Sequence, residues 1–260
     1  MNISLSVIGG GNMARAIIEG AIRGGILGGN EIALADPNET SRSHFDALGC
    51  LTVSSAEELP KSSTVLLAVK PQVFEFVASQ VSCEIIYSIM AGVTTDSITK
   101  STGVNKVVRV MPNLPCSVGF GAAGIALGSN ATEDDATLAM RLFSEIGVVV
   151  KVQESLMDAV TAISGSGPAY LFLLAESMIQ GGLDAGLDIE TATKLVQQTV
   201  RGASELLAKD CRTATELREA VTSHGGTTAA ALSVMNDRGV SNAIRDAVIA
   251  ARDRGVELGS

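Results

Sequence analysis

The sequence predicts an α/β fold in the first part of the chain and an all-helical region in the second. Over roughly the first 160 residues, short β-branched runs alternate with stretches of helical periodicity. This pattern is typical of a mainly parallel sheet with helices on both faces. Beyond that point the β-branched runs stop and only long helical patterns remain. We therefore expect two domains, residues 1–160 and residues 161–260.

The predicted elements follow one another along the chain. A strand is expected at residues 3–8 and an amphipathic helix at residues 13–25, which ends at glycine. Further strands are predicted at 31–36, 63–69, 84–90, 105–111, 121–128 and 147–152. Further helices are predicted at 43–48, 133–146, 169–186, 189–208, 214–221, 229–236 and 242–258. The helix at 133–146 should begin with acidic residues, which the helix dipole favours in the first turn.

Composition and charge exclude several classes of protein. Of the 260 residues, 46% are hydrophobic and 18% are charged, so extensive disorder is not expected. The formal net charge is −9 and Lys and Arg are not clustered, which argues against nucleic acid as a partner. No apolar run reaches the roughly 20 residues that span a bilayer. The N-terminus lacks the basic segment of a signal peptide.

Cysteine and histidine usage points to a protein without a metal. The sequence contains four scattered cysteines, Cys50, Cys83, Cys116 and Cys211. None has CxxC spacing, and we expect free thiols in a reducing compartment. The two histidines, His44 and His224, are too few for an ordinary zinc site. We therefore predict a cytoplasmic protein with no metal.

A glycine-rich loop joins the first predicted strand to the first helix. The segment IGGGNMA has the form Gly9-x-Gly11-x-x-Ala14. The first glycine allows a tight turn, the second lets the backbone approach a pyrophosphate, and the small alanine lets the helix pack on the sheet. The phosphates would rest on the helix N-terminus. The alternative is a purely structural glycine turn, but the strand–loop–helix context favours a Rossmann-like dinucleotide-binding domain.

Asp36 ends the second predicted strand, about 20 residues after the glycine loop, where an acidic residue usually hydrogen-bonds the adenosine ribose. Its charge would repel a 2′-phosphate, so we expect NADH to be usable. Asn38, Thr40, Ser41 and Arg42 follow closely and could hold that phosphate. In the alternative interpretation, Asp36 only starts a turn and caps the next helix.

Further segments make the chain resemble a known family. AVKPQ (68–72) and RVMPN (109–113) end predicted strands, and SGSGPAY (164–170) opens the second domain. Together with the glycine loop and TSHGGTT (222–228), they resemble the pyrroline-5-carboxylate reductase family over nearly the whole chain, in the same order and spacing. The pairing of SGSGPAY with GGTT is the most specific part. His224 is a departure, because the family commonly has proline there.

The resemblance implies an NAD(P)H-dependent oxidoreductase that reduces the C=N bond of 1-pyrroline-5-carboxylate to L-proline, with NADPH, NADH or both as cofactor. It also implies that the helical domains of two subunits intertwine into a homodimer, that the substrate lies between this dimer and the nucleotide domain, and that dimers assemble into a larger ring. Two alternatives remain. One is a β-hydroxyacid dehydrogenase, although the helix after SGSGP has no lysine before Lys194. The other is a non-catalytic NAD(P)-binding sensor.

The cofactor is expected to contact the ends of five predicted strands of the first domain. The predicted cofactor-binding residues are Ile8, Gly9, Gly10, Gly11, Asn12, Met13, Asp36, Ala68, Val69, Lys70, Pro71, Ile89, Met90, Ala91 and Asn113. Lys70 is interpreted as a surface lysine near the cofactor rather than a buried base. Asn113 either hydrogen-bonds the nicotinamide or closes a turn. A structural ion pair is expected for Arg109.

The substrate carries a carboxylate, which backbone N–H groups at a helix start can hold. The predicted substrate-binding residues are Ser164, Ser166, Gly167, Gly225, Gly226, Thr227 and Thr228. Reduction of a C=N bond places negative charge on nitrogen, so a hydroxyl donor within hydrogen-bond reach would serve as catalyst. The resemblance assigns this role to Thr228. Alternatively, Thr228 only caps its helix, and Ser164 or Ser166 only caps the helix whose first turn contains Pro168.

Overall fold

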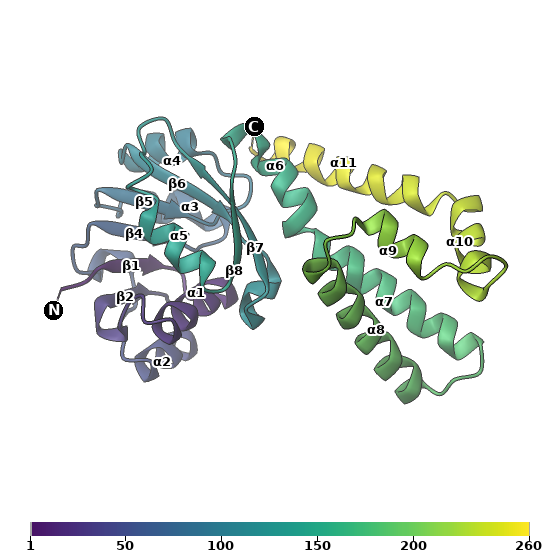
Figure 1. Ribbon diagram of the computed structural model, residues 1–260. Helices are drawn as coiled ribbons and strands as arrows, with labels where there is room; N and C mark the ends of the chain where they lie inside the picture. Colours follow the sequence, from purple (N-terminus) through teal and green to yellow (C-terminus); the bar gives the residue numbers. More distant parts are fainter. Residues whose placement is uncertain (1, 260) are drawn as a thin grey trace. The chain divides into compact units, whose positions relative to one another are not determined.

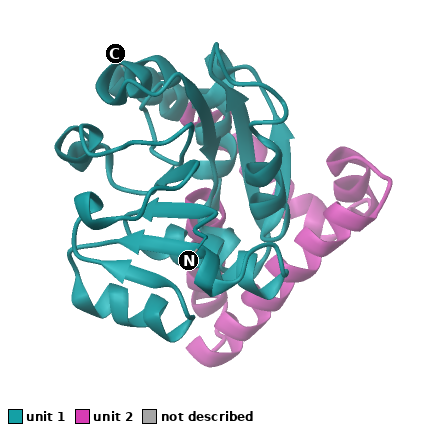
Figure 2. Cartoon of the chain, turned by 90° about the vertical axis from the view of Figure 1, so that its left-hand side faces the viewer, with its two compact units in different colours: residues 1–168, 249–260 teal, residues 169–248 magenta. Residues whose placement is uncertain are grey.

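The computed structural model describes residues 2–259, which divide into two compact units (Figure 2). Unit 1 consists of residues 1–168 and 249–260, and unit 2 of residues 169–248. Unit 1 contains the sheet and the helices that pack on it, and unit 2 contains only helices. No helix within residues 2–259 has the length and apolar character needed to cross a membrane.

Unit 1 is built on an eight-stranded sheet with the order β3-β2-β1-β4-β5-β6-β7-β8 (Figure 1). The strands are β1 (Leu5–Ile8), β2 (Ile32–Ala35), β3 (Leu51–Val53), β4 (Thr64–Leu67), β5 (Ile85–Ser88), β6 (Lys106–Met111), β7 (Gly121–Leu127) and β8 (Gly147–Lys151). All neighbours pair in parallel except β6 with β7. The predicted mainly parallel sheet is confirmed, and β3 is the strand that the sequence analysis missed.

Helices occur in both units. The α-helices are α1 (Asn12–Arg23), α2 (Glu39–Ala47), α3 (Pro71–Ala78), α4 (Thr95–Thr102), α5 (Thr137–Ser144), α6 (Met157–Val160), α7 (Gly167–Asp184), α8 (Ile189–Lys209), α9 (Ala214–Ala220), α10 (Thr227–Asp237) and α11 (Val240–Gly259). The short 3-10 segments are η1 (Gly29–Glu31), η2 (Ala56–Glu58), η3 (Leu114–Val118) and η4 (Glu154–Leu156). A π-helical segment, η5, covers Thr161–Gly165. The sequence analysis missed α3, α4 and α6, because four to eight residues give too few turns for a clear helical period.

Two hydrophobic cores lie on opposite faces of the sheet, because successive side chains of a strand point to opposite sides. Val7 of β1 belongs to the core that includes Phe45 of α2 and Phe143 of α5. The next residue, Ile8, belongs to the other core, with Phe74 of α3. Helices therefore cover both faces, as the near-continuous apolar strands predict.

The acidic residues before α5 do not form its first turn, contrary to the sequence prediction. The helix begins at Thr137 with no acidic residue in its first turn. Asp135 instead closes the preceding turn: its carboxylate accepts hydrogen bonds from the N–H and the hydroxyl of Thr132, both at 2.8 Å, and from the Lys106 ammonium at 2.9 Å. These three donors hold the acidic segment outside the helix.

The hydrogen bond from Lys106, together with those from Thr132, lowers the pKa of Asp135 to about 2. This folded-state pKa lies below the unfolded value of about 3.9. The carboxylate therefore stabilises the fold fully above pH ~4, and the contribution disappears as the pH falls through about 2.

We predict that Asp135→Asn lowers the melting temperature at pH 7 by roughly 2–4 °C, the change that about 1 kcal/mol causes in a protein of this size. The difference from wild type should shrink as the pH falls from about 4 towards 2, as measured by thermal melts across that range. Glu133→Gln is the matched control, because Glu133 pairs with Lys151 and both side chains are more than half exposed. If Asp135→Asn lowers the melting temperature by the same amount at every pH, the prediction is contradicted.

Candidate functional site

A cavity of about 500 Å³ lies at the carboxyl ends of β1, β2, β3 and β4. It is lined by the glycine loop from Ile8 to Gly11, by Asp36, by Ser54–Ala56, by Ala68–Lys70 and by one face of α3. The strand order reverses between β1 and β4, and open α/β sheets bind ligands at such a point. The cavity is lined by eight of the fifteen predicted cofactor residues, whereas Asn12, Met13, Pro71, Ile89–Ala91 and Asn113 do not line it.

The three glycines of the loop meet different surroundings. Gly9 has φ +100°, and a Cβ atom there would lie 2.7 Å from the carbonyl oxygen of Ala68. A Cβ atom on Gly10 would overlap the hydroxyl of Ser41. On Gly11 it would meet no atom within 4 Å. Gly9 and Gly10 are thus required by the fold, whereas nothing within the chain requires a glycine at position 11.

The first turn of α1 is suited to an anion. The helix begins at Asn12 after Gly11, which provides no side-chain cap, and no acidic residue lies in the first turn. The first N–H groups of a helix have no partner within the helix, and its dipole favours negative charge there. Since Gly11 lines the cavity, a phosphate group could approach these N–H groups closely.

Asp36 connects the glycine loop to the turn after β2. One carboxylate oxygen accepts a hydrogen bond from the N–H of Gly10 at 2.6 Å, and the other accepts one from the N–H of Asn38 at 2.8 Å. Each oxygen keeps a further lone pair for a ligand. The turn interpretation of Asp36 is therefore confirmed. The capping interpretation is wrong, because α2 is capped by Asn38, which accepts from the N–H of Ser41 at 3.1 Å.

Ser41 and Arg42 complete this connection. The Ser41 hydroxyl donates to the carbonyl of Gly10 at 2.8 Å, and the Arg42 guanidinium donates to the main-chain carbonyl of Asp36 at 2.7 Å. Ser41 therefore binds the glycine loop, and Arg42 binds the turn after β2. Arg42 is half-buried and remains the nearest cation in sequence to Asp36.

The segment after β4 has the predicted arrangement. Lys70 precedes α3 and Pro71 is its first residue, where the missing N–H of proline costs no hydrogen bond. The Lys70 side chain is exposed and lines the cavity, so it is a surface lysine, as expected. No buried base is present at this position.

The loop after β5 offers mainly its backbone. Met90 is 1% exposed and belongs to the core shared with α3 and α4, so its side chain anchors the loop rather than contacting solvent. Ile89 is partly buried against the opposite core, and Ala91 is exposed. Any contact of Met90 with a cofactor would therefore come from its main-chain atoms.

Asn113 lies buried just after β6, and its side-chain amide has three partners, one of which is the Cys116 thiol, which donates to Oδ1 at 3.9 Å. Its Nδ2 donates to the carbonyl of Ser164 at 3.0 Å, and its Oδ1 accepts from the N–H of Ala122 at 2.9 Å. Nearby, the buried Arg109 has ion pairs of 3.7 Å to Glu154 and 3.8 Å to Asp158, which confirms the expected structural pairing.

The SGSGP segment is not capped by its serines, contrary to one of the two interpretations. The hydroxyl of Ser164 donates to the carbonyl of Val160 at 2.9 Å within a helical run. That run passes from α6 through the π-helical segment Thr161–Gly165 to α7. Pro168 does lie in the first turn of α7, as expected. π-Helical turns are frequent at functional sites, and this one contains Ser164.

In unit 2 the GGTT segment forms the expected helix start. α10 begins at Thr227 after Gly226, and Gly225 has φ +67° in the preceding turn. Thr228 is the second residue of the helix and Gly226 occupies the capping position, so the interpretation of Thr228 as the cap is wrong. Within residues 2–259, the structure has no hydrogen-bond partner for the hydroxyl of Thr227 or of Thr228, which leaves both free for a ligand.

One wall of the cavity was not foreseen from the sequence. Val73, Phe76, Val77 and Gln80 line it, and the first three are on α3. Phe76 is 75% exposed, which is unusual for an aromatic side chain that does not face a ligand. The spacing i, i+3, i+4, i+7 was visible in the sequence, but only once a helix is assigned after Pro71 does it define a face.

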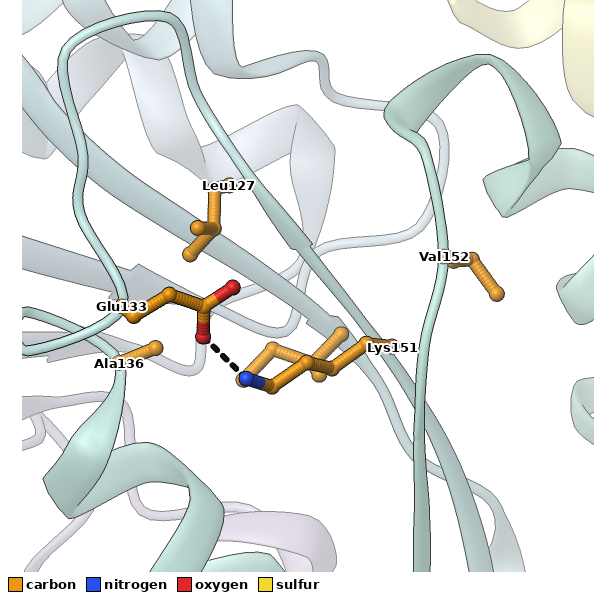
Figure 3. A pocket seen from close by; sticks show the side chains of 6 residues that line it. Leu127, Glu133, Ala136, Lys151 and Val152 are labelled. Carbon is orange, nitrogen blue, oxygen red and sulfur yellow. Dashed lines mark hydrogen bonds and ion pairs between the residues drawn. The ribbon is translucent and has the colours of Figure 1, made fainter.

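A smaller cavity, of about 180 Å³, lies beside β7 and β8 (Figure 3). The Lys151 ammonium extends across it to the carboxylate of Glu133, and the other lining side chains are aliphatic. This ion pair already neutralises the charges there, so the cavity is a weaker site than the one at the glycine loop. Among the described residues, no group of three His, Cys, Asp or Glu side chains is arranged to hold a metal ion.

Comparison with family models matches both parts of the chain. Residues 154–258 match a model described as pyrroline-5-carboxylate reductase dimerisation. Residues 4–92 match a model described as NADP oxidoreductase, coenzyme F420-dependent. The glycine loop, Asp36 and the segment 68–71 all lie within the second match.

Full-length relatives agree with these models. Pyrroline-5-carboxylate reductase of Synechocystis is 40% identical over 100% of this chain and 99% of its own length, and that of Pisum sativum is 36% identical over 98% and 96%. The structure of the Coxiella burnetii enzyme superposes with a TM-score of 0.91 at 33% identity, covering 100% of both chains. The Plasmodium falciparum enzyme, solved with NADP bound, gives 0.87 at 30% identity, covering 100% and 99%.

We predict that Gly11→Ala weakens binding of a nicotinamide dinucleotide by about tenfold. The added methyl group would meet no atom of the chain, but it would stand in the cavity between the loop and a bound phosphate. The melting temperature should stay within about 2 °C of wild type. Fluorescence titration with NADPH and NADH measures the binding.

Gly10→Ala is the matched comparison, because its methyl group would overlap Ser41 and should lower the melting temperature by several degrees. If Gly11→Ala binds both dinucleotides as tightly as wild type does, the cofactor does not approach the loop at this position.

Proposed function

The chain belongs to the pyrroline-5-carboxylate reductase family, and from this membership we propose its reaction: NAD(P)H-dependent reduction of the C=N bond of 1-pyrroline-5-carboxylate to L-proline. It is an oxidoreductase with a small-molecule substrate, and the product belongs to proline biosynthesis. The observation that carries the proposal is the similarity to named pyrroline-5-carboxylate reductases over the full length of the chain.

The residues around the glycine-loop cavity fit a nicotinamide dinucleotide. An open Cβ direction at Gly11, an uncapped helix start and a cavity of about 500 Å³ support a pyrophosphate at Asn12–Met13. In the proposed assignment, Ile8–Met13, Asp36, Ala68–Pro71 and Ile89–Ala91 contact the cofactor. When bound, its reduced nicotinamide supplies the hydride. The structure of a relative with NADP bound supports use of the phosphorylated form as well.

We further propose that Thr228 is the catalytic residue. As the C=N bond is reduced, negative charge develops on the substrate nitrogen unless a proton or a donor is present. The Thr228 hydroxyl would donate to this nitrogen. Two features support the assignment: the hydroxyl has no partner among residues 2–259, and Gly226 rather than Thr228 occupies the capping position of α10.

The carboxylate of the substrate would be held by main-chain N–H groups. We propose Gly225–Thr228 for this role, together with Ser164, Ser166 and Gly167. α10 starts with a glycine and has no acidic residue in its first turn, which favours an anion. At Gly167 an added Cβ atom would meet no atom of the chain within 4 Å, so the backbone is open to a ligand there.

Oligomerisation is supported by the dimerisation model and by the apolar surface of unit 2. Ala192 and Val196 are its only buried hydrophobic residues among those described, whereas Phe172 and Leu173 of α7 are 60% and 64% exposed. We propose that residues 161–260 form the dimerisation domain and that dimers assemble into a larger ring. All four cysteines, within residues 2–259, are free thiols, and we propose a cytoplasmic location.

The reaction is tested by following NAD(P)H absorbance after addition of 1-pyrroline-5-carboxylate, with each cofactor in turn. Consumption of the reduced cofactor and formation of proline are expected. Tight NADPH binding without turnover of this or a related cyclic imine would instead support a nucleotide sensor.

We predict that Thr228→Ala and Thr228→Val lower kcat by about 10²-fold, the usual contribution of a positioned proton donor. Thr228→Ser keeps the hydroxyl and should retain most of the activity. Melting temperatures should change by no more than a few degrees, because Thr228 does not cap α10. Steady-state kinetics measure kcat, and thermal melts measure the melting temperature.

Ser233→Ala, an exposed hydroxyl on the same helix, is the control and should leave kcat unchanged. Full activity of both Thr228→Ala and Thr228→Val would remove the catalytic assignment.

We also predict that Asp36→Ser shifts the ratio of kcat/KM values about tenfold toward NADPH, since a negative charge near a 2′-phosphate is repulsive. Asp36→Asn distinguishes loss of the charge from loss of the hydrogen bond, because it removes the charge but keeps an acceptor for the Gly10 N–H. Glu39→Gln, an exposed acid in the first turn of α2, should change the ratio much less. An unchanged ratio in both Asp36 variants would show that Asp36 does not select the cofactor.

A further inference from the structure

The side chain of Asn113 joins three segments of unit 1 that are distant in sequence. It lies just after β6 and is 8% exposed. Its Oδ1 accepts from the N–H of Ala122 in β7 at 2.9 Å. Its Nδ2 donates across 51 residues of sequence to the carbonyl of Ser164 at 3.0 Å. The Oδ1 atom and one of the two Nδ2 N–H groups are therefore used inside the protein.

The Ser164 carbonyl needs an outside donor because of Pro168. In an α-helix, a carbonyl accepts from the N–H four residues later. For Ser164 that residue is Pro168, which has no N–H and whose ring crowds the same carbonyl. Ser164 is half-buried, and its carbonyl would lack its helical hydrogen bond without another donor. The Asn113 amide supplies the missing hydrogen bond.

The helix around Ser164 is correspondingly wider than an α-helix. Thr161–Gly165 is π-helical, and the N–H of Ser166 donates to the carbonyl of Thr161, five residues earlier, at 2.8 Å. A Cβ atom on Gly165 would lie 2.9 Å from the Met111 methyl group, so this turn packs closely on the end of β6. The exact course of the backbone from Ser164 to Gly167 thus depends on contacts with β6.

We infer that Asn113 is a positioning residue for the substrate, and that it acts by fixing the backbone of Ser164–Gly167. The inference rests on the proposed function, in which that backbone contacts the substrate carboxylate. It differs from the expectation that Asn113 binds the nicotinamide. With its amide committed to Ser164 and Ala122, Asn113 governs the substrate rather than the cofactor.

The test is a double-mutant cycle with Asn113→Asp and Pro168→Ala, measured at pH 8. The aspartate keeps the shape and the acceptor for Ala122, but as a carboxylate it cannot donate to Ser164. When Pro168 is present, Asn113→Asp should raise KM for 1-pyrroline-5-carboxylate about tenfold and leave KM for NAD(P)H unchanged. With Pro168→Ala, the new N–H at position 168 can serve Ser164, so the effect of Asn113→Asp should fall to about twofold or less.

A purely structural role would not produce this pattern, because loss of folded protein lowers the apparent kcat and leaves both KM values alone. Asn105→Asp, an exposed residue just before β6, is the control for the added charge. If Asn113→Asp does not fold, Asn113→Ala in both backgrounds takes its place. Gly167→Ala, which is open to solvent and should be at least as stable as wild type, reports whether substrate contacts this backbone.

The outcomes are distinguishable. A wild-type protein that does not reduce the imine overturns the proposed function, and the inference with it. An active wild type in which Gly167→Ala raises KM for the imine, but neither Asn113 variant does, overturns the inference alone. A rise in KM for NAD(P)H in the Asn113 variants assigns Asn113 to the cofactor and also overturns it.

Discussion

The hydrogen bond from the Gly10 N–H to the Asp36 carboxylate organises the nucleotide-binding half of the protein. It joins the loop after β1 to the turn after β2 at 2.6 Å, and the Ser41 hydroxyl reinforces the same junction. The positive φ of Gly9 and its close approach to Ala68 bring the loop against the segment after β4. Three strand ends are thereby held at one edge of the sheet, which is where the cavity of about 500 Å³ lies. The site exists because the backbone of this loop can approach its neighbours without side chains in the way.

Much of the fold followed from periodicity, because buried parallel strands and long helices have strong patterns. The glycine loop and the GGTT helix start were predictable for the same reason: each glycine stands at the boundary of a clear element. α3, α4, α6 and β3 were not, since three to eight residues carry little periodic signal. The acidic run before α5 was misinterpreted because Lys106, which holds Asp135 outside the helix, is 29 residues away in sequence.

The SGSGP segment shows a different limit of prediction from sequence. Serine and glycine before proline are the usual signs of a helix start, and Pro168 does occupy a first turn. What the pattern could not reveal is that the preceding helix continues into this turn through a π-helical segment. That continuation requires a donor for the Ser164 carbonyl, and Asn113 provides it from just after β6. The position of Pro168 in a first turn could be predicted from the local sequence, but the continuous helix before it could not, because it depends on the distant residue Asn113.

The helix starts proposed to meet ligands at Gly11 and Gly226 have no side-chain cap, a feature that they share with α3, α5 and α6. α2, α4, α8 and α9 each begin with a side chain that accepts from a backbone N–H of the first turn. α1 and α10 begin with a glycine and have no such cap, and their first turns contain no acidic residue. A glycine in place of a capping side chain costs a helix about a few tenths of a kcal/mol. A phosphate or carboxylate bound at these N–H groups recovers that stabilisation, so ligand binding and helix stability are coupled at both positions.

α5 also lacks a side-chain cap, but it follows a turn that is closed by the hydrogen bonds between Asp135 and Thr132. The absence of a cap is therefore informative only together with an open approach to the backbone. Such an approach is found at Gly11 and at Gly225, which precedes the capping residue Gly226, whereas Ala136 is buried.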